Sequence, residues 1–244
     1  MRGSRWSIAV TAVGMLVTPF VDRRGRVADG VTTVVVGGLA ATTFDRMRRR
    51  PGRPVRLVVA LLGAGWLIEW IGTRTGRPFG RYEYTGRLRP TLGGVPLVVP
   101  MAWFAMAGPA REVARAVLGG NSSRSARVVA GAAALTAWDL FLDPQMVSAG
   151  HWRWSSSGRY RGVPVSNFVG WFSASLVLMT LAEVLDPPGE RPIDAVLVGQ
   201  YAGMAVMETA AFATFLGDRR VAAVGGSAML PPAILAVTRL GGTR

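Results

Sequence analysis

Four carboxylic acids lie inside long apolar segments of this chain, where an ionisable side chain is costly to bury: Glu69, Asp139, Asp143 and Glu208. A charged group in the middle of a bilayer costs about 2.5–3.5 kcal/mol on insertion scales. Apolar surroundings disfavour the charged form, so such a carboxyl can hold a proton near neutral pH, and two neighbouring carboxyls tend to divide into one acid and one base. Proton transfer is therefore the first chemistry to consider. For Glu208 we expect instead a pairing with Arg or a hydrogen bond between helices.

Two of these acids, Glu69 and Asp139, each begin one copy of a unit that occurs twice in the sequence. In both copies the acid precedes a Gly-x-aromatic-x-aromatic element by 11 residues, and a Gly-Val-Pro precedes a Trp-Phe by 9 residues. The first copy consists of Glu69, Gly80–Tyr84, Gly94–Pro96 and Trp103–Phe104, and the second of Asp139, Gly150–Trp154, Gly162–Pro164 and Trp171–Phe172. The shared order and spacing predict that the two acids occupy equivalent positions, each beside a cluster of aromatic rings.

Aromatic rings beside an acid suit the protonation of an alkene. A carboxylic acid that protonates an electron-rich double bond leaves a carbocation, which aromatic faces stabilise by cation–π attraction. A carboxylate can then hold the cation or activate the water that captures it. The reaction needs no cofactor, and a lipid-soluble polyene can reach such a site from the bilayer. Taken singly, each Trp or Tyr is typical of a membrane-interface belt, but their repetition beside a buried acid favours a site.

The elements that must position these residues are helices that cross a membrane. Half of the 244 residues are hydrophobic and only 17% are charged, and the apolar segments reach the roughly 20 residues that one crossing requires. We therefore predict an all-α polytopic membrane protein of about 7–8 transmembrane helices, with residues 1–244 in a single integral membrane domain. The predicted spans are 6–21, 27–44, 55–72, 95–118, 126–143, 168–185, 195–216 and 220–240.

The two copies, at about 55–118 and 126–185, begin on helices separated by an even number of crossings. They therefore have the same orientation, which predicts a parallel internal repeat about an axis along the membrane normal. Each copy is expected to be a helix, an aromatic interfacial hairpin and a second helix. Side chains alternate along an extended segment, so each aromatic pair should point to one side. Pro144 is expected to end the helix that carries Asp139.

Composition excludes several classes of function. All 28 basic residues are Arg and the net charge is +14, but no aromatics interleave with the Arg-rich segment 46–56, so anchoring to anionic lipid is a simpler interpretation than binding nucleic acid. That segment also favours an N-terminus inside the cell. The absence of Cys and the presence of one His, His151, leave no basis for disulfides, thiol nucleophiles or Cys/His zinc sites. We expect neither a metal nor a cofactor.

Several of these motifs resemble the carotenoid biosynthesis membrane proteins, a family that includes carotenoid 1',2'-hydratases and bisanhydrobacterioruberin hydratase. The resemblance covers about residues 55–185 and rests on Glu69 with Gly72, Gly76–Tyr84, Gly94–Pro96, Trp138–Pro144, Gly150–Trp154, Gly162–Pro164, Asn167–Phe168 and Gly170–Trp171. It implies a multi-pass protein of the cell (cytoplasmic) membrane that hydrates the terminal double bond of an acyclic carotenoid ψ end group to a tertiary alcohol. The implied partners are a lycopene-like carotenoid or bacterioruberin precursor, water, the lipid bilayer and other carotenoid enzymes.

Under this hypothesis, protonation at C-2' leaves a tertiary cation at C-1', where water adds. The resemblance brings no residue roles, so the assignments come from the residues themselves. We expect Asp139 to donate the proton, Glu69 to orient or activate water and Asp143 to tune the pair, and the choice between Asp139 and Glu69 as donor stays open. The residues expected to line the substrate pocket are Tyr82, Tyr84, Trp138, Trp152, Trp154, Asn167 and Trp171.

Two alternatives remain open. Asp139-x-x-x-Asp143 also resembles half of the Mg²⁺ site of membrane prenyltransferases, although the second Asp-rich motif is missing; Mg²⁺-dependent activity would support a carotenoid elongase. A non-catalytic carotenoid-binding scaffold would need the aromatic rings but not the acids. In that case, Glu69→Gln and Asp139→Asn would leave function intact.

Overall fold

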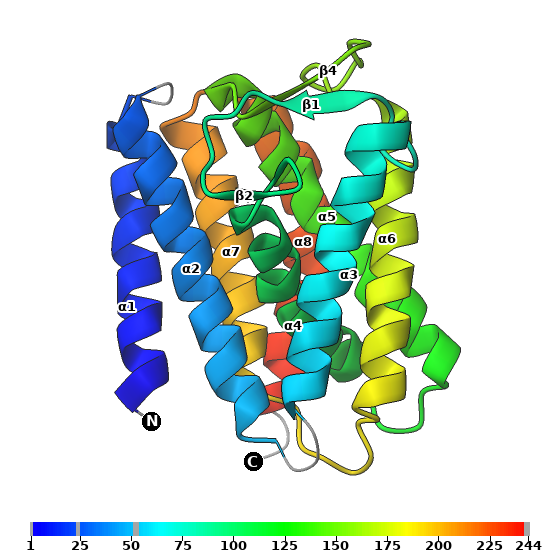
Figure 1. Ribbon diagram of the computed structural model, residues 1–244. Helices are drawn as coiled ribbons and strands as arrows, with labels where there is room; N and C mark the ends of the chain where they lie inside the picture. The colour runs from blue at the N-terminus through cyan, green and yellow to red at the C-terminus, as the bar shows by residue number, and fades with distance from the viewer. Residues whose placement is uncertain (1, 23–24, 51–53, 242–244) are drawn as a thin grey trace.

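The computed structural model describes residues 2–22, 25–50 and 54–241, and these form a helical bundle (Figure 1). The eight α-helices of the described residues are α1 (Arg2–Val17), α2 (Arg26–Arg48), α3 (Pro54–Thr75), α4 (Val98–Leu118), α5 (Arg124–Ala149), α6 (Val165–Leu185), α7 (Ala195–Thr214) and α8 (Arg219–Gly241). A short 3-10 helix, η1 (Thr18–Phe20), follows α1. Six of the described helices are long and apolar enough to cross a membrane, the exceptions being α1 and α4. The predicted fold class, a polytopic helical membrane protein, is confirmed.

Pro144 does not end α5, contrary to the sequence prediction. The helix continues to Ala149 and ends at Gly150, whose φ of 74° is a left-handed conformation that glycine adopts without strain. A proline inside a helix leaves the carbonyl four residues earlier without its N–H donor. Here that carbonyl belongs to Leu140, and the Tyr160 hydroxyl donates to it at 2.8 Å. Because Tyr160 supplies the missing donor, α5 can run one turn and more beyond Asp143.

The two aromatic elements form one sheet between them. Strand β1 (Tyr82–Tyr84) pairs antiparallel with β4 (Trp152–Trp154), with Tyr82 opposite Trp154 and Tyr84 opposite Trp152. The interfacial hairpin is therefore shared by the two copies rather than formed separately in each. This crosswise pairing of equivalent residues is what a two-fold axis along the membrane normal would produce. A second hairpin, β2 (Thr91–Leu92) with β3 (Val95–Pro96), lies in the first copy only.

The strands lie at one end of the bundle, and both chain termini lie at the other (Figure 1). We call these the strand end and the arginine end. The connections α3–α4 and α5–α6 run across the strand end, while α2–α3, α4–α5 and α6–α7 meet at the arginine end. Of the Arg-rich segment 46–56, residues 46–50 and 54–56 lie at the arginine end, and residues 51–53 fall outside the described part of the chain. Both aromatic elements thus occupy the same end, as the parallel orientation of the two copies predicts.

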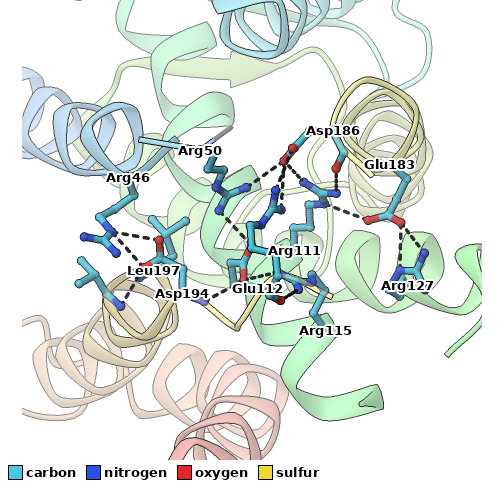
Figure 2. Close-up of polar contacts among 12 residues, drawn as sticks. Arg46, Arg50, Arg111, Glu112, Arg115, Arg127, Glu183, Asp186, Asp194 and Leu197 are labelled. Carbon is cyan, nitrogen blue, oxygen red and sulfur yellow. Dashed lines mark hydrogen bonds and ion pairs between the residues drawn. The ribbon is translucent and has the colours of Figure 1, made fainter. Parts of the chain in front are cut away.

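A buried network of ion pairs closes the arginine end (Figure 2). Glu112 of α4, fully buried, accepts from Arg50 at 2.9 Å, from Arg115 at 2.8 Å and from the backbone N–H of Asp194 at 3.0 Å. Arg111 donates to Glu183 at 2.9 Å, and Glu183 in turn accepts from Arg127 at 2.9 Å. These contacts join α4 to the segment that follows α2, to α6 and to the α6–α7 loop, and they join α5 to α6. Charges buried at this depth stay there because each is paired and hydrogen-bonded.

Candidate active site

An apolar cavity of about 490 Å³ opens beneath the β1–β4 sheet. Residues of helices α1 to α7 form the wall of the cavity. The aromatic side chains of β1 and β4 cover it at the strand end. Two carboxyl groups from the repeated units reach its surface, Glu69 from α3 and Asp143 from α5. Both stand six residues before the last residue of their helix, so they lie at a similar depth, about 9 Å below the strand end. A cavity of this size and polarity suits an apolar ligand with one polar reaction centre.

Glu69 is held by three hydrogen-bond donors. The hydroxyls of Tyr82 and Tyr84 donate to Oε2, the latter at 2.6 Å, and the indole N–H of Trp103 donates to Oε1 at 2.8 Å. Gly72 makes this arrangement possible, because a Cβ at that position would lie 3.0 Å from the Tyr82 hydroxyl. Burial, and then the charge of Glu69, raise the pKa of both tyrosines, so both remain donors. Three donors are the partners that a carboxylate requires in an apolar site.

Asp143 and Asp139 share one amide. The side-chain N–H₂ of Asn167 donates to both carboxyls, at 2.9 Å to Asp139 Oδ2, and the Trp152 indole N–H donates to Asp143 Oδ1 at 3.0 Å. Asp139 is fully buried and its Oδ1 has no hydrogen-bond partner among the described residues. Asp143 reaches the cavity, whereas Asp139 lies behind it and is absent from the cavity wall. Two carboxyls so close cannot both be charged at low cost, so the pair is suited to hold one proton.

Aromatic rings cover the cavity around the two acids. Trp103 and Trp171 stack with ring centroids 3.8 Å apart, and Trp138 meets Trp171 edge to face at 6.3 Å. On the roof, Tyr82 lies 5.9 Å from Trp154, and Tyr84 lies 5.8 Å from Trp152. Trp103 and Trp171 occupy equivalent positions in the two copies. The faces and edges of these rings provide the environment that a carbocation would need.

The side chains expected at the site come together. Glu69, Asp143 and every predicted pocket residue line the cavity: Tyr82, Tyr84, Trp138, Trp152, Trp154, Asn167 and Trp171. Asp139 does not line the cavity, and it contacts the site through Asn167 and Asp143.

Two residues named from the sequence, Trp103 and Glu208, were not assigned to the site. Trp103 donates to Glu69, and its equivalence to Trp171 was a signal that could have identified it. Glu208 of α7 also lines the cavity, and the expectation that it pairs with Arg or bonds between helices is wrong: none of the described residues forms a hydrogen bond or ion pair with it. Its carboxyl was already visible inside an apolar segment, but no sequence pattern linked it to the repeat.

Neighbouring contacts fix the strand end above the cavity. The imidazole of His151 lies between Asp29 of α2, 2.8 Å from its Nε2, and the sulfur of Met146, 3.1 Å from its Nδ1. Arg87 also donates to Asp29, at 2.7 Å. Burial lowers the pKa of His151, against the opposing effect of Asp29, so the neutral ring is favoured. No group of three or more His, Cys, Asp or Glu side chains in the described residues is arranged to hold a metal ion.

Comparison with known proteins agrees with the resemblance seen in the sequence. Residues 29–238 match the family model described as carotenoid biosynthesis protein. A curated relative, bisanhydrobacterioruberin hydratase of Haloarcula japonica, is 32% identical over 177 residues, which cover 72% of this chain and 59% of the relative. The chain thus spans about six tenths of the length of that relative. No solved structure matches the chain. With most of its length matched, the chain belongs to the carotenoid biosynthesis protein family.

Proposed function

We propose that this protein hydrates the terminal 1',2' double bond of an acyclic carotenoid ψ end group to a tertiary alcohol, in the cell membrane. The observation that carries the proposal is the pair of carboxyl groups, Glu69 and Asp143, that line one apolar, aromatic cavity with different hydrogen-bond partners. The curated relative from Haloarcula japonica is named bisanhydrobacterioruberin hydratase, and its name supports hydration as the reaction class.

The acid half of the reaction is assigned to Asp143. The sequence favoured Asp139 as donor, but Asp143 is the member of the pair that reaches the cavity. Asp139, sharing the Asn167 amide behind it, acts as a positioning residue that keeps one proton on the pair. Asp143 delivers this proton to C-2' of the end group, and the π electrons of the double bond form the new C–H bond. A tertiary cation then remains at C-1'.

The base half is assigned to Glu69. Its carboxylate, fixed by Tyr82, Tyr84 and Trp103, accepts a proton from the water whose oxygen bonds to C-1'. The stacked pair Trp103 and Trp171 stabilises the cation before water adds. Return of the proton from Glu69 to Asp143 restores the site, so the net change is the addition of one water to the alkene.

Pigment analysis in a lycopene-producing host tests the proposal. Expression of the chain should yield a carotenoid heavier by one water, with an unchanged polyene chromophore. Incubation of unlabelled, preformed lycopene with the protein in D₂O should place one carbon-bound deuterium at C-2' of the hydrated end group. Asp143→Asn and Glu69→Gln should remove the product. Glu83→Gln is the matched control, because Glu83 lies between Tyr82 and Tyr84 on β1 but points outward, with its side chain 63% exposed. Unchanged pigment in cells that contain the folded wild-type protein would contradict the proposal.

A further inference from the structure

A third carboxyl group faces the cavity from a wall that the reaction does not use. Glu208 stands six residues before Thr214, the end of α7, and so lies at about the depth of Glu69 and Asp143. Its neighbours on the cavity wall are apolar and include Met204, Met207 and Ala211. Methionine side chains adapt to the shape of a ligand. This part of the cavity therefore combines an adaptable apolar surface with one strong hydrogen-bond acceptor.

Glu208 differs from the other two acids in having no hydrogen-bond or charge partner in the part of the chain that the structure describes. Glu69 accepts from three donors and Asp143 from two, whereas none of the described residues donates a hydrogen bond to Glu208 or pairs with its charge. The side chain is neither fully buried nor fully exposed. A carboxyl inside an apolar site is costly when it lacks a hydrogen-bond partner. A ligand that fills the cavity and carries a donor would remove that cost.

The position of α7 places this acceptor on a different side of the cavity from Glu69, which lies on α3. Figure 1 shows α7 to the left of α3 and α6. Helix α5, which carries Asp143, packs against α7, with the rings of Phe141 and Phe212 stacked 5.7 Å apart. The cavity wall also includes aliphatic side chains of α2 and α4, among them Val36, Leu39 and Val99. An elongated apolar molecule can thus extend from Glu69 toward α7, with its reacting end between Glu69 and Asp143 and another atom at Glu208.

We infer that Glu208 is a specificity-determining residue that accepts a hydrogen bond from a hydroxyl group on the acyclic isoprenoid substrate, placed along the chain from the double bond that reacts. The inference rests on the proposed function. Carotenoids contain only carbon, hydrogen and oxygen, so a hydroxyl is the donor that this substrate class can offer. The enzyme should therefore prefer an acyclic substrate that already carries a hydroxyl over the matching compound that cannot donate a hydrogen bond.

Linear terpene alcohols test the inference, because each has the same isopropylidene end group as an acyclic carotenoid and one hydroxyl at a fixed distance. Geraniol, farnesol and geranylgeraniol are compared with their methyl ethers, which retain the oxygen but lack the donor. Dissociation constants come from the thermal stabilisation of the purified wild-type protein over a concentration series. At the chain length that spans the cavity, the alcohol should bind about tenfold or more tightly than its ether, as expected for a hydrogen bond to a carboxylate.

Glu208→Leu should abolish this preference while leaving the affinity for the ether unchanged, and Glu208→Gln, which keeps an acceptor oxygen, should retain most of it. Equal binding of alcohol and ether at every length, or a preference that survives in Glu208→Leu, would overturn the inference. The measurement does not depend on turnover. If the pigment assay fails while the alcohol preference is present, only the hydration proposal falls; if hydration occurs without the preference, only the role of Glu208 falls.

Discussion

Replacing Asp143 by Asn removes the proposed proton donor and keeps the shape of the side chain. An amide cannot deliver a proton to an alkene, so the step should lose the contribution of general acid catalysis. That contribution is typically 10²–10⁴-fold, or about 3–5 kcal/mol of the activation barrier. Because the aromatic wall of the cavity is unchanged, the loss should appear in kcat, with little change in KM.

The same substitution has a predictable effect on stability. The two oxygens of Asp143 accept from different donors, Asn167 and Trp152, and an Asn at this position has only one oxygen. One buried donor therefore loses its acceptor, at a cost of about 1–3 kcal/mol. The variant should fold, with a lower Tm than the wild-type protein.

The assay follows product formation from lycopene by protein purified in detergent, with thermal unfolding measured on the same samples. Asp139→Asn should reduce the rate less than Asp143→Asn, because Asp139 does not reach the cavity, and Glu83→Gln should behave like the wild-type protein. If Asp143→Asn keeps most of its rate and Asp139→Asn loses it, the assignment of the donor is refuted, and Asp139 must reach the substrate in a conformation different from this one.

Further predictions concern the bundle and the cation. Glu112→Gln leaves buried arginines without full charge compensation and should destabilise the protein by about 3–5 kcal/mol in thermal unfolding. Glu83→Gln breaks an exposed ion pair and should cost less than about 1 kcal/mol. Equal effects of the two substitutions would contradict the structural role of the ion pairs at the arginine end. Since burial lowers the pKa of His151, the unfolded chain binds a proton that the folded chain does not, so stability should be present above about pH 6.5 and fall as the pH decreases below it. His151→Gln should remove that part of the pH dependence, and an unchanged profile would count against it. Trp171→Leu removes one ring of the stacked pair and should slow hydration about 30-fold, from a loss of about 2 kcal/mol of cation–π stabilisation. Trp171→Phe keeps an aromatic ring and should retain most of the rate. Equal losses in the two variants would indicate that Trp171 has a packing role instead.

Much of this molecule was predictable because a bilayer imposes strong rules on sequence. A crossing needs about 20 apolar residues, so the helices and their order follow from hydropathy, and an acid inside such a helix is conspicuous. The repeated spacing predicted aromatic neighbours for Glu69 and Asp139. Glu69 has them, whereas in the second copy Trp152 donates to Asp143, one helical turn after Asp139. Even the shared orientation of the two aromatic elements followed from counting crossings.

Tertiary structure decided which of the acids reach the cavity and which hydrogen-bond donors each one accepts from. Glu69 and Asp139 have equivalent positions in sequence, but the first faces the cavity with three donors, while the second lies behind Asp143. The difference arises from side chains in other elements, such as Asn167 on α6, whose effect depends on packing between helices rather than on spacing along one of them. Glu208 is the clearest case: no sequence pattern links it to the repeat, and only the packing of α7 around the same cavity places its carboxyl on the cavity wall.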